Sequence, residues 1–278
     1  MTIVSNYIRI WLLNYPSPFA FFPLWQPFAQ GRDWEEQGNT HMKIPSIMEM
    51  LKAGVHFGHQ VSRWHPKMKQ YIFGQRNNVH VIDLERTQEM LGGTLESIKN
   101  LAKEGKVILF ASTRPQAKAV VKAAAIDCGM PYLADRWIGG LFTNFQEIKK
   151  LITKYNTLRE QQASGELEKY NKKERLDISK DLEKKEVSLG GLTTLTKMPD
   201  VLFVPSLQNE KTAMTEAKKM GVEVIGICDT NANPDNADYI IPANDDAVNS
   251  ITMMVNLVAA AIKEGKAEAE KVIGEVKE

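Results

Sequence analysis

The stretch Val107-Ile-Leu-Phe-Ala-Ser-Thr-Arg-Pro115 decides the fold. Its first five residues form a continuous apolar run, which is typical of a strand that other structure covers on both faces. We expect a helix to begin within Ser112–Pro115 and to run to about Cys128, where Gly129 ends it. A buried strand followed directly by a helix is the repeating unit of a parallel sheet.

The same alternation continues towards the carboxyl terminus. Helices are expected to start near Asn209 and Asp246, and a further helix is expected from Thr87 to Lys103. Because helices separate the strands, the connections between them should be right-handed crossovers. The sequence therefore predicts an α/β fold with a mostly parallel sheet. Its further strands are predicted at residues 131–133, 201–204, 224–227 and 239–241.

One segment breaks this alternation. Residues 144–197 carry two thin apolar stripes with charged flanks, a denser one from Ile148 to Leu158 and a sparser one from Leu176 to Leu182. Such stripes predict an antiparallel helical hairpin inserted into the α/β body. Its basic residues could touch RNA, but a solvated charged face is the default explanation for them.

The first 41 residues differ from the rest of the chain. They hold nine of the 22 aromatic residues and four of the twelve prolines. These prolines interrupt every apolar run before it reaches the ~20 residues of a membrane span. Ser46 and Glu49 then have the spacing of a capping box for a short helix. Our hypothesis is that Met42 is the natural start and that 1–41 is an upstream extension; the alternative is an aromatic-rich arm that docks on a partner.

Composition places limits on the kinds of protein to consider. The 278 residues are 25% charged and 43% hydrophobic, with a net charge of +1, which is ordinary for a protein with a sizeable core. This balance gives no overall attraction to nucleic acid, so any RNA-binding surface must be local. Cys128 and Cys228 lie in separate apolar segments and are expected to be buried thiols, without a disulfide or a metal.

These patterns divide the chain into four parts. We expect an extension at 1–41, an α/β body at 42–143 and 198–265, the helical hairpin at 144–197, and a tail at 266–278.

A stretch from Ala53 to Asp83 mixes cations with flat rings and has no acidic residue before its last. Cations attract phosphates and rings stack on bases, so the mixture suits folded or single-stranded RNA. The alternative is a surface loop followed by two strands, 71–73 and 79–82, whose rings are core and whose turn is Gly74–Asn78. The cations are Arg63, Lys67, Lys69 and Arg76, and the rings are His56, Phe57, His59, Trp64, His65, Tyr71 and Phe73.

A second cluster runs from Tyr132 to Phe145. Arg136 and Trp137 precede a pair of glycines, and glycine lets the backbone approach a ligand or partner closely. Thr143 and Asn144 should cap the following helix, and a core position is expected for Trp137.

An enzymatic function is the alternative to an RNA-binding one. Ligands of open α/β sheets bind beyond the carboxyl ends of the strands, where Ser112 and Thr113 could hold a phosphate of a metabolite or nucleotide. A helix cap explains the same two residues, and the sequence has no phosphate-binding glycine loop. The run Asp229–Asp235 could hold a cation, but it lacks the glycine and glutamate of an EF-hand loop, which favours a turn with Asx hydrogen bonds.

Taken together, the motifs resemble the S-two family of small-subunit ribosomal proteins in its bacterial form. They follow the family order over about residues 43–265. The matching segments are 53–60, 63–68, 71–74, 135–145, 199–204, 229–231 and 241–247.

The resemblance implies a flavodoxin-like three-layer sandwich with a five-stranded parallel sheet, plus a protruding coiled-coil hairpin. It also implies a cytoplasmic, non-catalytic constituent of the small ribosomal subunit, without cofactor, metal or membrane. This constituent binds small-subunit ribosomal RNA where head meets body. Its neighbours there are other small-subunit proteins, including the large mRNA-binding protein numbered one.

The resemblance also selects the residues expected at the RNA. Arg63, Lys67, Lys69, Arg76 and Arg136 should contact phosphates, while His56, Trp64 or His65 should pack against nucleotides or order the loop. The full expected set is His56, His59, Arg63, Trp64, His65, Lys67, Lys69, Arg76, Arg114, Arg136 and Asn144.

Overall fold

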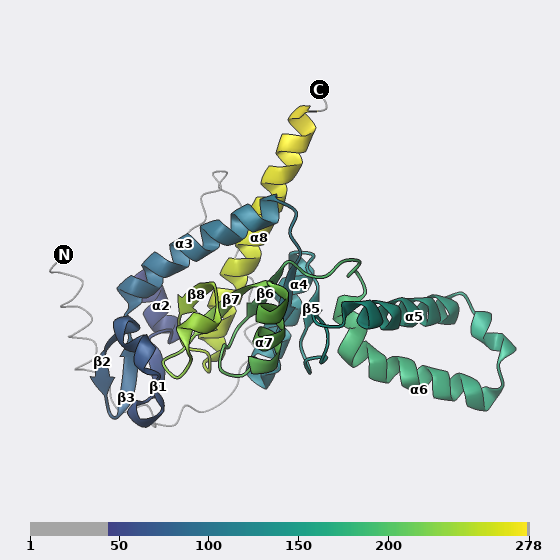
Figure 1. Ribbon diagram of the computed structural model, residues 1–278, viewed down its shortest axis with the longest axis horizontal. Coiled ribbons are helices and arrows are strands. Elements are labelled where there is room, and N and C mark those ends of the chain that lie inside the picture. The colour runs from purple at the N-terminus through teal and green to yellow at the C-terminus, as the bar shows by residue number, and fades with distance from the viewer. Residues whose placement is uncertain (1–43, 277–278) are drawn as a thin grey trace. The chain divides into compact units, whose positions relative to one another are not determined.

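The computed structural model describes residues 44–276 (Figure 1). The expected extension at 1–41 and the expected start at Met42 lie outside the described residues.

A parallel sheet forms the centre of the fold. Within the described residues it has five strands in the order β5-β4-β6-β7-β8. The first of its strands along the chain, β4, lies between β5 and β6, so the strand order reverses there and the sheet is doubly wound, as in flavodoxin-like folds. The predicted α/β class is therefore confirmed. The strands are β4 (Ile108–Ala111), β5 (Tyr132–Leu133), β6 (Val201–Val204), β7 (Glu223–Cys228) and β8 (Tyr239–Pro242).

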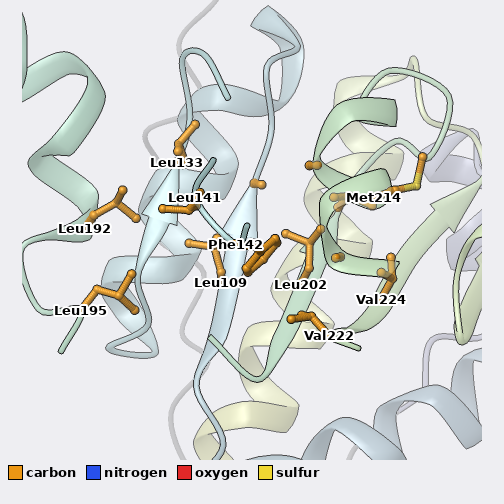
Figure 2. Packing of buried hydrophobic residues seen from close by; sticks show 14 of the residues in the cluster. Leu109, Leu133, Leu141, Phe142, Leu192, Leu195, Leu202, Met214, Val222 and Val224 are labelled. Atoms are coloured by element: carbon orange, nitrogen blue, oxygen red, sulfur yellow. The ribbon is translucent and has the colours of Figure 1, made fainter. Parts of the chain in front are cut away.

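Helices cover both faces of this sheet. On one face, Leu109, Leu202 and Val224 share one buried cluster with Phe142 and with Met214 of α7 (Lys211–Met220) (Figure 2). Alternate residues of the same strands point to the other face, where Phe110 and Phe203 meet edge-on with ring centroids 5.1 Å apart. Three further helices, α3 (Leu84–Lys103), α4 (Pro115–Asp127) and α8 (Val248–Val276), pack together, with α8 in contact with both of the others.

The hairpin segment consists of α5 (Phe145–Ala163) and α6 (Lys172–Leu189), which lie side by side (Figure 1). No strand lies between residues 144 and 197, all of which the structure describes, as the sequence predicts. The stripe on α5 is centred on Ile148, Ile152 and Tyr155, which are buried in the same cluster as the sheet. Leu151 lies at the margin of that stripe and is 46% exposed, contrary to its predicted place within it.

A small antiparallel sheet precedes the parallel one. It follows helix α2 (Ile47–Ala53), whose predicted capping box of Ser46 and Glu49 is confirmed. The predicted turn Gly74–Asn78 is too long, because only Asn77 and Asn78 turn, with φ of 48° and 63°. Asparagine tolerates positive φ, so these two residues suffice for a tight hairpin. The strands, in the order β1-β3-β2, are β1 (Phe57–Gln60), β2 (Ile72–Arg76) and β3 (Val79–Ile82).

Directly after α6, the 3-10 helix Gly190–Leu192 approaches β5 closely at Gly191. A methyl group at Gly191 would overlap the backbone oxygen and the ring of Tyr132. The neighbouring Gly190 has room, since a methyl group there would meet only the flexible side chain of Glu186, at 3.6 Å. Gly191 is therefore required where the hairpin rejoins the sheet, and Gly190 is not.

We predict that Gly191→Ala lowers the free energy of unfolding by about 1–3 kcal/mol, the usual cost of overpacking a close contact. Urea unfolding of the full chain measures this value. Gly190→Ala is the matched control and should cost far less. Equal losses from the two variants would contradict the close approach.

Candidate nucleic-acid interface

The segment between β1 and β2 presents the predicted cations on two short 3-10 helices. The first is Val61–Arg63 and the second is Pro66–Tyr71. Proline at the start of the second fits its fixed φ, and the imidazole of His65 accepts a hydrogen bond from the backbone N–H of Lys67 at 3.3 Å. Arg63, Lys67 and Lys69 are exposed on these turns.

This segment is fixed to the carboxyl end of β7. The backbone N–H groups of His65 and His59 donate to the carbonyl and the hydroxyl of Thr230, at 2.7 and 2.8 Å. Met68 is fully buried, and its sulfur lies 3.3 Å from the sulfur of Cys228. The chain passes so close that a side chain at Gly58 would meet Thr230 at 2.6 Å. The cations therefore sit on a rigid support.

A surface groove of about 760 Å³ runs beside the second 3-10 helix. Lys67, Lys69 and Arg86 line it, together with the ring of Phe73, which is 46% exposed. Lys67 forms an ion pair with Asp235 across the groove. Sequence analysis did not identify Arg86, because it lies in the first turn of α3, outside the ring-and-cation stretch.

The predicted rings take different positions. His56 is 1% exposed, and burial lowers its pKa to about 4. Trp64 is half-buried against His80, with ring centroids 5.4 Å apart. His56 is thus too deeply buried to pack against a nucleotide, whereas Trp64 and His65 are partly exposed. Arg76 lies at the end of β2, beside the turn.

Two other predicted residues, His59 and Arg114, belong to a partly buried polar cluster, in which Asp229 and Asp245 are fully buried and Asp246 is 56% exposed. The two ring nitrogens of His59 lie 3.1 Å from Asp229 and 3.3 Å from Asp246. The guanidinium of Arg114 pairs with Asp245 at 3.1 Å and with Asp246 at 2.6 Å. The hydrogen bond to Asp229 raises the pKa of His59, and burial beside Asp229 raises the pKa of Asp245 to about 6.

His59, Asp229, Asp245 and Asp246 bring one imidazole and three carboxylates together, with ligand atoms within 4.8 Å of one another. This donor set could hold a divalent cation. The predicted Asx turn is also present, since the N–H of Asp235 donates to the side chain of Asn233 at 3.2 Å.

The structure corrects the predicted cap at the start of α4. The N-cap residue is Arg114, because Pro115 restricts the residue before it to an extended conformation. Thr113 instead donates its N–H and its hydroxyl to the carboxylate of Glu210, at 2.6 and 2.8 Å. Glu210 is 3% exposed and thus places a built-in anion where a phosphate would bind. This geometry argues against the metabolite-binding alternative.

The last two predicted residues lie between β5 and α5. Arg136 and Asn144 are exposed, and Asn144 is the N-cap residue of α5, so the predicted helix start is confirmed. The prediction that the side chains of Thr143 and Asn144 cap this helix is wrong. Within the described residues the side chain of Asn144 makes no cap hydrogen bond, and the hydroxyl of Thr143 donates to Glu216 instead. Trp137 is half-buried on the core, with its ring centroid 5.4 Å from that of Phe142.

The family profile described as ribosomal protein S2 matches residues 50–265. The chain belongs to the ribosomal protein S2 family. The "Small ribosomal subunit protein uS2" of Geotalea uraniireducens is 46% identical over 220 residues, 79% of this chain and 86% of that protein. The uS2 protein of Salinibacter ruber is 44% identical over 223 residues, 80% of this chain and 70% of that protein. The uS2 protein of Wolinella succinogenes is 44% identical over 233 residues, 84% of this chain and 86% of that protein.

The S2 family match extends from α2 through the hairpin into α8, so it includes every predicted RNA-binding residue. In the part of the chain that the structure describes, no helix is both long and apolar enough to cross a membrane.

We predict that His56 makes stability depend on pH between 6.5 and about 4. An unfolded histidine takes up its proton near pH 6.5, whereas folded His56 does so at about 4. The unfolded state therefore binds more protons in this window, and acidification removes up to about 3 kcal/mol of stability. Urea unfolding of His56→Gln at pH 7 and pH 4.5 should show a smaller acid loss than the wild type. His65→Gln, as the control, should lose as much stability between pH 7 and pH 4.5 as the wild type. If His56→Gln also lost as much stability as the wild type, the acid loss would not come from His56.

Proposed function

We propose that this protein is a non-catalytic structural component of the small ribosomal subunit that binds small-subunit ribosomal RNA. The observation that carries the proposal is the exposed cationic segment 63–69, held on the sheet by Thr230 and by buried Met68. Phosphate contacts position a protein on RNA, and the shape of the fold supplies specificity. A preorganised segment also loses little conformational entropy on binding.

We divide the predicted residues by role, according to their exposure and their partners. Arg63, Lys67, Lys69 and Arg136 are exposed, so they are the proposed phosphate contacts. His59 and Arg114 are engaged with the aspartates of the polar cluster, so their role is to hold the segment and the sheet edge together.

The hairpin is the second part of the proposed interface. Lys149, Lys150 and Lys154 are exposed on α5, and Lys150 and Lys154 lie four residues apart on one face of the helix. We assign them phosphate contacts as well, on a hairpin that forms a protruding coiled coil.

The family resemblance supports the finer parts of the proposal. These are a position at the junction of head and body in the cytoplasmic subunit, and contact with the large mRNA-binding protein numbered one. The names of the relatives as small ribosomal subunit proteins support the particle itself.

We predict that replacing Lys67 and Lys69 together by alanine weakens binding to transcribed small-subunit ribosomal RNA. Each lost phosphate contact should reduce the slope of log K against log salt by about one, because fewer counterions are released. Filter binding or fluorescence anisotropy over a range of salt concentrations measures this slope.

The matched control is Lys122→Ala with Lys219→Ala, which removes the same charge from exposed positions on α4 and α7. It should keep the wild-type slope. If the Lys67/Lys69 variant kept the wild-type slope as well, these two lysines would not contact phosphates.

A further inference from the structure

The loop that leads from β5 into α5 is folded around a single carboxylate, that of Glu216 on α7. One oxygen accepts the indole N–H of Trp137 at 3.0 Å and the backbone N–H of Gly140 at 2.9 Å. The other oxygen accepts the backbone N–H of Phe142 at 3.3 Å and the hydroxyl of Thr143 at 3.4 Å. Four residues of one loop thus share one acceptor group.

The carboxylate is buried and depends on this loop. Glu216 is 9% exposed, and among the described residues no cation forms an ion pair with it. Burial alone would oppose its ionisation, but the hydrogen bonds from Gly140 and Trp137 outweigh burial and lower its pKa. Conversely, the loop without Glu216 would lose its shared acceptor, and the buried N–H of Phe142 would be left unpaired, which costs free energy.

The loop carries two elements of the proposed RNA interface. Arg136, which is exposed, directly precedes the first donor, Trp137. Asn144, where α5 begins, directly follows the last donor, Thr143. Gly140 has a φ of +88°, which glycine adopts without strain and which lets the loop close on the carboxylate. The loop that folds around Glu216 therefore links Arg136 to the start of α5, the helix that carries Lys149, Lys150 and Lys154.

We propose that Glu216 is a positioning residue for RNA binding: it holds the loop 137–143 so that Arg136 and the start of α5 present their charges to phosphates together. The inference rests on the proposed function. Glu216 itself does not contact RNA, since its oxygens are occupied by the loop. It is an acidic residue that strengthens binding to a polyanion through the residues that it orders.

The test is binding of the full chain to transcribed small-subunit ribosomal RNA, with Glu216→Gln compared with Glu89→Gln. Both substitutions remove one negative charge, and Glu89 is exposed on α3, so a charge effect alone would strengthen RNA binding slightly in both. We expect Glu216→Gln to bind about tenfold more weakly than Glu89→Gln and to lose about one unit of salt slope. Equal binding by the two variants would overturn the proposal.

A double-mutant cycle with Arg136→Ala separates positioning from general destabilisation. If Glu216 acts through Arg136, adding Glu216→Gln to Arg136→Ala should weaken binding by a much smaller factor than it does in the wild type. Full additivity of the two losses would show that Glu216 does not act through Arg136.

Where Glu216→Gln fails to fold, Trp137→Phe takes its place in the cycle. It removes one donor to the carboxylate and keeps the ring on the core. Trp137→Phe should weaken RNA binding less than Glu216→Gln, and it should weaken binding less in the Arg136→Ala background than in the wild type. If the losses of binding from Trp137→Phe and Arg136→Ala simply added, the proposal would again be overturned. Failure of the wild-type protein to bind the RNA would instead contradict the proposed function, which distinguishes the two failures.

Discussion

The attachment of the cationic segment 63–69 to Thr230 is the constraint on which the rest of the proposed RNA interface depends. Thr230 follows β7 at the carboxyl edge of the parallel sheet, and it receives backbone N–H groups from His59 and His65. The bond from His59 joins parts of the chain 171 residues apart. The buried side chain of Met68 adds an apolar contact to the same edge. The lysines on either side of Met68 can then remain exposed.

The same edge of the sheet bears on the proposal that this α/β fold binds RNA and is not an enzyme. Open α/β sheets usually take their ligands there. Here the protein's own side chains occupy the edge: Glu210 takes the N–H of Thr113, and Asp245 takes Arg114 and the hydroxyl of Ser206 at 2.6 Å. The buried acidic groups at this edge thus find their partners within the protein. This arrangement reconciles a net charge of only +1 with a strongly cationic local surface.

The parts of this architecture that are encoded locally could be predicted from the sequence. Buried strands such as 201–204, the capping box at Ser46 and the strand-free hairpin depend on neighbouring residues. The roles of Glu210 and Glu216 depend on partners more than 70 residues away, which no local pattern reveals. For His56 and Arg114 the residue types suited RNA, but only the fold shows that one is buried and the other is paired with aspartates.

The most direct measurement is sedimentation of a native cell extract, in which the protein is followed at low and at high salt. The account predicts that it travels with the small ribosomal subunit at low salt and is released at high salt, because screening weakens phosphate contacts. A protein that stays at the top of the gradient as a free species even at low salt would contradict the account.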